Sequence, residues 1–144
     1  MKNIGSVSEY SDDRARDLLC AYRQQLSQSR YISMPEIYEK VVMMPAPRFY
    51  VSETRAVVAI TKIIKGDQLL YMRPTKREMF FEIYRRYLIE KKKFPHLPLA
   101  HLLGMVIEQK APQFYITPSS AKVYILKAKR KWLEERKRKL YRCM

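Results

Sequence analysis

Apolar residues recur at helical spacing along most of the chain, and the polar positions between them mark where helices begin and end. Residues 12–28 have apolar side chains every three or four positions, behind two aspartates that favour a helix N-terminus. A second helix is expected from Ser33, which with Glu36 forms a possible capping box, and two prolines after residue 44 end it. Residues 1–11 are polar and aperiodic, which predicts a flexible arm.

A third helix is expected after a short extended segment. Ser52 can cap it, Ala56, Ile60 and other apolar residues share one face, and Gly66 can end it. The β-branched residues within 57–64 also allow a strand. The matching segment of the second half continues into a run of strong helix formers, so a helix is favoured here and the strand is left open.

The second half predicts the same three helices again. Residues 67–76 form an apolar linker, which we expect to pack rather than to swing freely. A possible capping box of Thr75 and Glu78 opens the next helix, and a long basic helix ends the chain. The pattern therefore predicts an all-α protein of two three-helix units, over 12–66 and 77–144, packed together.

The two halves are related by an internal repeat. Residues 45–56, PAPRFYVSETRA, return 65 positions later as KAPQFYITPSSA, and the same offset extends through the helices without a gap. The repeated aromatic pairs, Phe49 with Tyr50 and Phe114 with Tyr115, would be able to stack on bases. An aromatic pair fixed between two helices is more typical of packing beneath the third helix, so we expect at least the phenylalanines inside.

Two resemblances bear on function. Residues 33–64 and 97–131 resemble helix-turn-helix modules, although the predicted connection between the helices is longer than the usual tight turn. The motif Ala-Pro-x-Phe-Tyr-Val/Ile-Ser/Thr resembles one in uncharacterised small basic proteins of phages and mobile elements of gut Bacteroidetes. That resemblance implies a phage context and brings no established activity.

Composition and charge point to a polyanionic partner. The chain of 144 residues is 47% hydrophobic, which is enough for a folded domain, and its 29 Lys and Arg against 14 acids give a net charge of +15. Nucleic acid is the first expectation, DNA before RNA, while a merely solvated basic surface is the alternative. Residues 1–65 have a net charge of +3 and residues 66–144 one of +12.

The candidate phosphate contacts are bases of the motif, the third helices and the C-terminal tail. The tail, residues 127–142, is the strongest signal because it holds nine bases and two acids. Simple solvation, RNA and an acidic protein remain alternatives. The candidates are Arg48, Arg55, Lys62, Lys65, Lys110, Lys122, Lys127, Lys129, Arg130, Arg136, Lys137, Arg138 and Lys139.

No pattern of catalytic or metal-binding residues stands out. His96 and His101 lack a partner at metal-ligand spacing, Cys20 and Cys143 are isolated, and the three glycines form no phosphate loop. We therefore expect a non-enzymatic protein without a metal or cofactor. The sequence also lacks a signal-peptide pattern and an apolar run of membrane-spanning length, which predicts the cytoplasm of a bacterial host, or a virion, with no membrane partner. A phage virion component is the alternative function.

Overall fold

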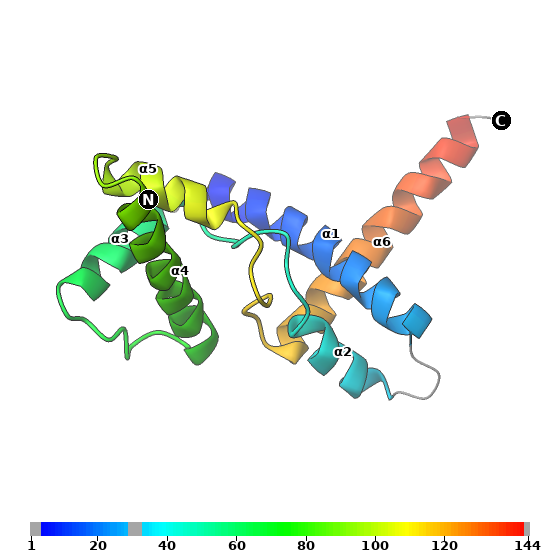
Figure 1. Cartoon of the computed structure of the whole chain (residues 1–144). Coiled ribbons are helices and arrows are strands. Elements are labelled where there is room, and N and C mark those ends of the chain that lie inside the picture. Colours follow the sequence, from blue (N-terminus) through cyan, green and yellow to red (C-terminus); the bar gives the residue numbers. More distant parts are fainter. Residues whose placement is uncertain (1–3, 29–32, 143–144) are drawn as a thin grey trace. The chain divides into compact units, whose positions relative to one another are not determined.

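The computed structural model describes the backbone of residues 4–28 and 33–142, and the side chains of residues 10–28 and 33–142. The regular secondary structure in this part of the chain consists of helices alone, so the predicted all-α class is confirmed (Figure 1). Residues 57–64 are helical, which resolves the choice between helix and strand. The helices are α1 (Ile4–Gln28), α2 (Met34–Val42), α3 (Glu53–Ile64), α4 (Pro74–Lys93), α5 (Leu99–Ile107) and α6 (Pro118–Arg142).

Two predicted boundaries differ from the structure. Helix α1 starts at Ile4, whereas residues 1–11 were expected to be an irregular arm, of which residues 1–3 lie outside the described part. The apolar spacing extends back to Val7 and Ile4, which favours helix in spite of the polar residues between them. Helix α4 starts at Pro74, so it takes in the end of the linker expected over 67–76.

The helix caps follow the sequence in part. Ser52 accepts a hydrogen bond from the backbone nitrogen of Arg55 at 3.2 Å, as expected for an N-cap. Ser33 occupies the N-cap position of α2 but makes no side-chain capping bond. In α4 the N-cap is Arg73, so the capping box expected from Thr75 does not form. Both helices have a proline in the first turn, which presets the helical backbone and removes one donor that a cap would serve.

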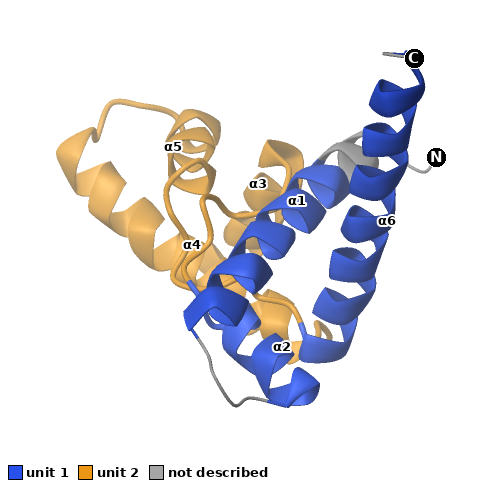
Figure 2. Cartoon of the chain, turned by 90° about the vertical axis from the view of Figure 1, so that its right-hand side faces the viewer, with its two compact units in different colours: residues 1–44, 117–144 blue, residues 45–116 orange. Residues whose placement is uncertain are grey.

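The helices group into two compact units, and each unit combines helices from both repeats (Figure 2). Unit 1, residues 1–44 and 117–144, contains α1, α2 and α6. Unit 2, residues 45–116, contains α3, α4 and α5. The third helix of the first repeat, α3, packs on α4 and α5, and the third helix of the second repeat, α6, packs on α1 and α2. This grouping differs from the contiguous units 12–66 and 77–144, and from the helix-turn-helix packing expected at 33–64 and 97–131, because α2 does not pack on α3 and α5 does not pack on α6.

The two copies of the repeated motif pair with each other at the junctions between the units. These copies, residues 45–51 and 110–116, are called here the paired motif. Ala46 and Ala111 stand at equivalent positions of the repeat and exchange two backbone hydrogen bonds of 2.9 Å in an antiparallel bridge. Prolines on both sides of Ala46 favour extended backbone over a tight turn. The chain therefore runs from α2 into unit 2 instead of turning back onto its own repeat.

The aromatic residues of the paired motif stack across the two copies within unit 2. Phe49 stacks on Tyr115 with ring centroids 6.1 Å apart, and Tyr50 stacks on Phe114 at 6.0 Å. The exposed fraction is 1% for Phe49 and 3% for Phe114, which confirms the expectation that the phenylalanines lie inside. In each stacked pair, the phenylalanine of one copy contacts the tyrosine of the other copy. The two copies of the motif are therefore complementary to each other.

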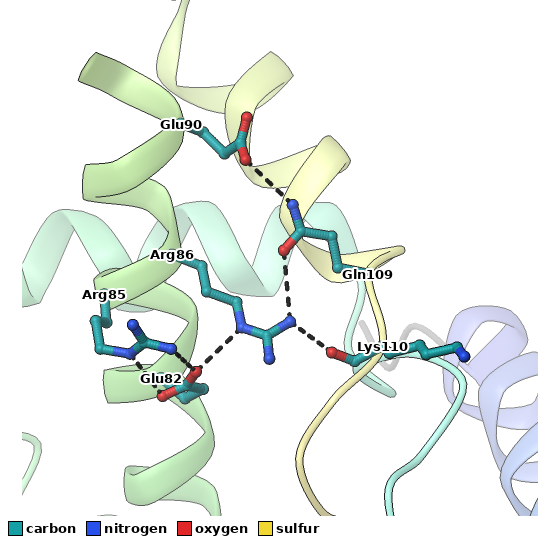
Figure 3. A network of polar contacts seen from close by, with 6 residues as sticks. All are labelled: Glu82, Arg85, Arg86, Glu90, Gln109 and Lys110. Carbon is teal, nitrogen blue, oxygen red and sulfur yellow. Dashed lines mark hydrogen bonds and ion pairs between the residues drawn. The ribbon is translucent and has the colours of Figure 1, made fainter. Parts of the chain in front are cut away.

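A polar network on α4 holds the second copy of the motif in place (Figure 3). The Arg86 guanidinium donates to the backbone oxygen of Lys110, to Gln109 at 3.4 Å and to Glu82 at 3.0 Å. It also lies 5.1 Å from the centre of the Phe49 ring. Hydrogen bonds from Arg85 and from Arg86 lower the pKa of the Glu82 carboxyl, so the carboxylate stays ionised at neutral pH. The network thus anchors a turn that contains no regular secondary structure.

Each unit has its own apolar core. Every helix of unit 1 contributes to the first core, where Tyr22 also stacks on Tyr38 with centroids 5.8 Å apart. In unit 2 the core lies between α3, α4 and α5, and Leu69 of the linker is fully buried, which agrees with the packing expected of that segment. The buried aliphatic residues include Leu18, Leu19, Ile37, Val41 and Ile125 in unit 1, and Ile60, Ile83, Leu102, Leu103 and Val106 in unit 2.

The titration of Tyr115 offers a test of this arrangement. Burial, followed by the negative charge of Glu82, raises the pKa of Tyr115 to about 12. The folded state therefore holds the phenol proton of Tyr115 more tightly than the unfolded state does. The contribution of Tyr115 to the unfolding free energy is fully present below about pH 10 and is lost as the pH rises from about 10 to 12. In urea unfolding, the decrease in unfolding free energy between about pH 10 and 12 should be smaller by about 1–2 kcal/mol in Tyr115→Phe than in the parent protein. An unchanged slope in the variant would contradict the buried environment of this side chain.

Candidate nucleic-acid interface

The structure divides the thirteen candidate bases between the two units. Arg48, Arg55, Lys62, Lys65 and Lys110 lie in unit 2, and all the others lie on α6 in unit 1. Unit 2 has thirteen bases and six acids, for a net charge of +7, and unit 1 has sixteen bases and eight acids, for +8. The imbalance of +3 and +12 between the sequence halves therefore does not persist between the folded units.

Within unit 1 the excess charge comes from one helix. Residues 1–44 hold six bases and six acids, whereas residues 117–144 hold ten bases and two acids. The positive field of this unit consequently follows α6. A row of bases along a single helix is a geometry that can track a line of phosphates.

Two of the candidate bases in unit 2 are engaged by other parts of that unit. The Nε atom of Arg48 donates to the backbone oxygen of Phe49 at 3.2 Å, and the side chain is half-buried. The Lys62 Nζ atom donates to the Tyr71 hydroxyl at 3.1 Å, and this hydrogen bond raises the pKa of Lys62. Lys62 nevertheless remains exposed, as do the other three candidates of this unit. Three of these four exposed bases belong to α3, where Arg55 and Lys62 lie within the helix and Lys65 is its C-cap residue.

The first half of α6 packs against α1. Arg14 donates to the Tyr124 hydroxyl at 2.6 Å and lies 4.5 Å from the centre of that ring. Farther along, Lys129 donates to the Tyr22 hydroxyl at 3.1 Å, with its Nζ atom 4.2 Å from the ring centre. These contacts advance along both helices in the same direction. Lys129 is therefore half-buried and partly committed to helix packing.

The second half of α6 is a fully exposed basic helix. Every residue from 131 to 142 is exposed, and in Figure 1 this segment is the orange to red end of the helix, running away from α2. Trp132 and Leu133 do not extend the buried stripe of α6, because their exposed fractions are 41% and 52%. The face that buries Ile125 continues into Arg136 and Lys139, whose charges prevent further core packing.

This exposed segment is held as a helix by its own sequence. Leu, Glu, Lys and Arg dominate residues 133–140, and all four residue types have high helix propensity. Lys139 and Arg142 lie in the last turn, where cations interact favourably with the helix dipole. Trp132 is flanked by the guanidinium groups of Arg23, 5.0 Å from its ring centre, and of Arg136, at 5.1 Å. The Arg23 side chain therefore ties the start of the exposed segment to α1.

Several exposed bases were not among the candidates. Lys131 and Arg142 belong to the same helix and continue its charge. On α4 the last turn consists of exposed lysines at 91–93, and Lys76 is exposed near its start. The run of three lysines was visible in the sequence as a charge cluster, but the repeat has no equivalent cluster in its first copy.

The part of the chain that the structure describes contains no group of three or more His, Cys, Asp or Glu side chains able to hold a metal ion. Cys20 is a free, exposed thiol on α1, and Cys143 lies outside the described residues. Across residues 4–28 and 33–142, no helix has the length and apolar character that a membrane span requires.

The chain has no significant match to a protein-family model, to a curated protein or to a solved structure.

Proposed function

We propose that this chain is a non-enzymatic DNA-binding protein whose main contact surface is the exposed part of α6. The supporting observation is that residues 131–142 of α6 are all exposed. They make up most of the segment 127–142, which holds nine bases and two acids. Sixteen helical residues span about 24 Å at about 1.5 Å per residue. Duplex DNA presents one phosphate charge per ~1.7 Å of axis, so several phosphates lie within reach of such a helix.

The helical form of the basic segment favours duplex DNA over duplex RNA. The major groove of B-form DNA admits an α-helix, whereas the major groove of A-form RNA is too narrow for side chains to read. In this proposal the bases of α6 neutralise phosphates and release counterions, and the exposed bases of unit 2 add further phosphate contacts. The two repeats would represent a tandem duplication whose third helices have been exchanged.

A virion structural or packaged protein of a phage is the second candidate. Leu133 and Leu140 are exposed on the same basic helix, at 52% and 63%, and phosphates offer no partner for leucine side chains. A role in which α6 contacts both a genome and a protein would use both kinds of residue. Such a component would still bind duplex DNA through the same bases.

Neutralising the tail is expected to weaken DNA binding without unfolding the protein. Replacing Arg136, Lys137, Arg138 and Lys139 with Gln removes four exposed charges from a segment without core contacts. Affinity for a labelled duplex should fall, and the slope of log K against log salt should decrease by about 0.9 for each phosphate that is no longer neutralised. Fluorescence anisotropy at several salt concentrations measures both quantities, and a thermal melt checks the fold.

The matched control removes four exposed charges from α4, by replacing Lys76, Lys91, Lys92 and Lys93 with Gln. If α6 is the main contact surface, this variant should retain much more affinity than the α6 variant. Equal reductions would show that net charge alone drives binding. Undiminished affinity of the α6 variant would reject the proposed interface.

A further inference from the structure

Three leucines form an exposed stripe along α6. Leu126, Leu133 and Leu140 have exposed fractions of 43%, 52% and 63%. They follow one another at seven-residue intervals, which is about two turns of an α-helix, so they lie on one side. Ile125 and Ala121, by contrast, are buried against the rest of unit 1, which places the leucine stripe on a different face of the helix.

Bases flank this stripe on both sides. Helical spacing puts Lys122 and Lys129 along one edge and Arg130 and Lys137 along the other. Neither of the two acids of α6, Glu134 and Glu135, falls within this arc. The surface is therefore one row of leucines between two edges rich in positive charge, with Val123 exposed at the start of the second edge and Lys129 of the first edge also bonded to Tyr22.

The width and the charge of the stripe restrict what can cover it. A single row of leucines at heptad spacing supplies one of the two apolar positions of a coiled-coil seam, and it is narrower than the broad apolar face of helices that lie on membranes. A second copy of this chain would bring like charges into contact along both edges, which disfavours self-pairing. A helix with acidic flanks would instead place opposite charges beside each row of bases.

We propose that the leucine stripe of α6, defined by Leu126, Leu133 and Leu140, binds an acidic amphipathic helix of another protein. The partner presents apolar side chains against the leucines and Glu or Asp at the flanking positions, as charged positions do in coiled coils. This inference concerns the leucines, which contribute nothing to phosphate binding, and so it goes beyond the proposed DNA contact.

The probe for the test is a fluorescent synthetic peptide of about three heptads, with Leu at the a and d positions and Glu at e and g. A companion peptide has Lys at e and g. The full-length protein should bind the acidic peptide and not the basic one in anisotropy titrations. Replacing both Leu133 and Leu140 with Gln should weaken binding about tenfold or more, because their apolar surface would no longer be buried.

A control variant and a second ligand test whether the loss of peptide binding is specific to the leucine stripe. Val58 and Ile64 on α3 are exposed to a similar degree, 51% and 52%, so replacing both with Gln should leave peptide affinity unchanged. The Leu133→Gln, Leu140→Gln variant should bind labelled duplex DNA as the parent protein does. Abolished peptide binding with retained DNA binding thus separates this inference from the proposed function.

Three outcomes would overturn the inference. One is peptide binding that is insensitive to the leucine substitutions, which would reduce the interaction to charge alone. Another is leucine-dependent binding to vesicles of phosphatidylcholine and phosphatidylglycerol without binding to the peptide, which would assign the stripe to a membrane surface. The third is leucine-dependent dimerisation in sedimentation velocity, which would assign it to a second copy of the chain.

Discussion

Fragments 1–66 and 67–144, produced separately, are expected to lose cooperative folding, and mixing them is expected to restore it. Each fragment holds two helices of one unit and one helix of the other, because unit 1 needs α6 and unit 2 needs α3. Without its partner, fragment 1–66 would expose the face of α3 that contains Ile60, and fragment 67–144 would expose Ile125 on α6. Far-ultraviolet circular dichroism during urea unfolding measures both the disruption and the recovery.

The effect should be large because a short isolated helix is marginal in water, and most helical stability comes from packing an apolar face. A chain cut between residues 66 and 73 by an engineered protease site, but not separated, is the control and should keep both units. Cooperative unfolding of fragment 67–144 alone, at the melting temperature of the whole protein, would show that the contiguous unit 77–144 is the true folding unit.

The sequence predicted the helices well because their apolar spacing is a local property. Ala56, Ala59, Ile60 and Ile63 were expected on one face of a helix, and all four are buried in α3. The cap at Ser52 and the turn at Gly66, where φ is +99°, were also readable, since each depends on a few neighbouring residues. Local chemistry therefore determines where the elements lie along the chain.

The partner of each third helix could not be predicted for a physical reason. A repeat at constant offset gives α3 and α6 similar apolar faces, and it gives the helix pairs that receive them similar surfaces. Hydrophobic pattern alone does not distinguish packing within a repeat from packing between repeats. One contact that joins the two repeats is the pairing of Ala46 with Ala111, which involves backbone atoms, so no side-chain pattern records it.

The candidate interface was predictable as a charged segment but not residue by residue. The basic run over 127–142 was evident from the sequence, and most of its bases are exposed on α6. The contact between Lys129 and Tyr22, and the exposure of Trp132, depend on where α1 ends its contact with α6. That point is set by tertiary packing, which propensity and spacing do not contain.

Truncating a phenylalanine of the paired motif is expected to destabilise the protein strongly. Phe49 is 1% exposed, stacks on Tyr115 and lies beneath the guanidinium group of Arg86. Phe49→Ala or Phe114→Ala should each cost about 3–5 kcal/mol of unfolding free energy, the usual range for emptying a buried phenylalanine site. The cost should be larger for Phe49→Ala than for Phe114→Ala by about 0.5–1 kcal/mol, because the Phe49 ring also makes the cation–π contact with Arg86.

Phe94 supplies the matched control, since it is 37% exposed at the corner after α4. Phe94→Ala should cost well under half as much, because its ring already meets solvent and leaves only a small cavity. Denaturant unfolding of the three variants gives the comparison, and titration with single-stranded DNA tests the alternative. A stacking platform for bases would show the opposite result, with Phe49→Ala keeping its melting temperature and losing single-strand binding. Burial of both phenylalanines against the tyrosines of the other copy leaves no free ring face for a base, so stability should be what the substitution removes.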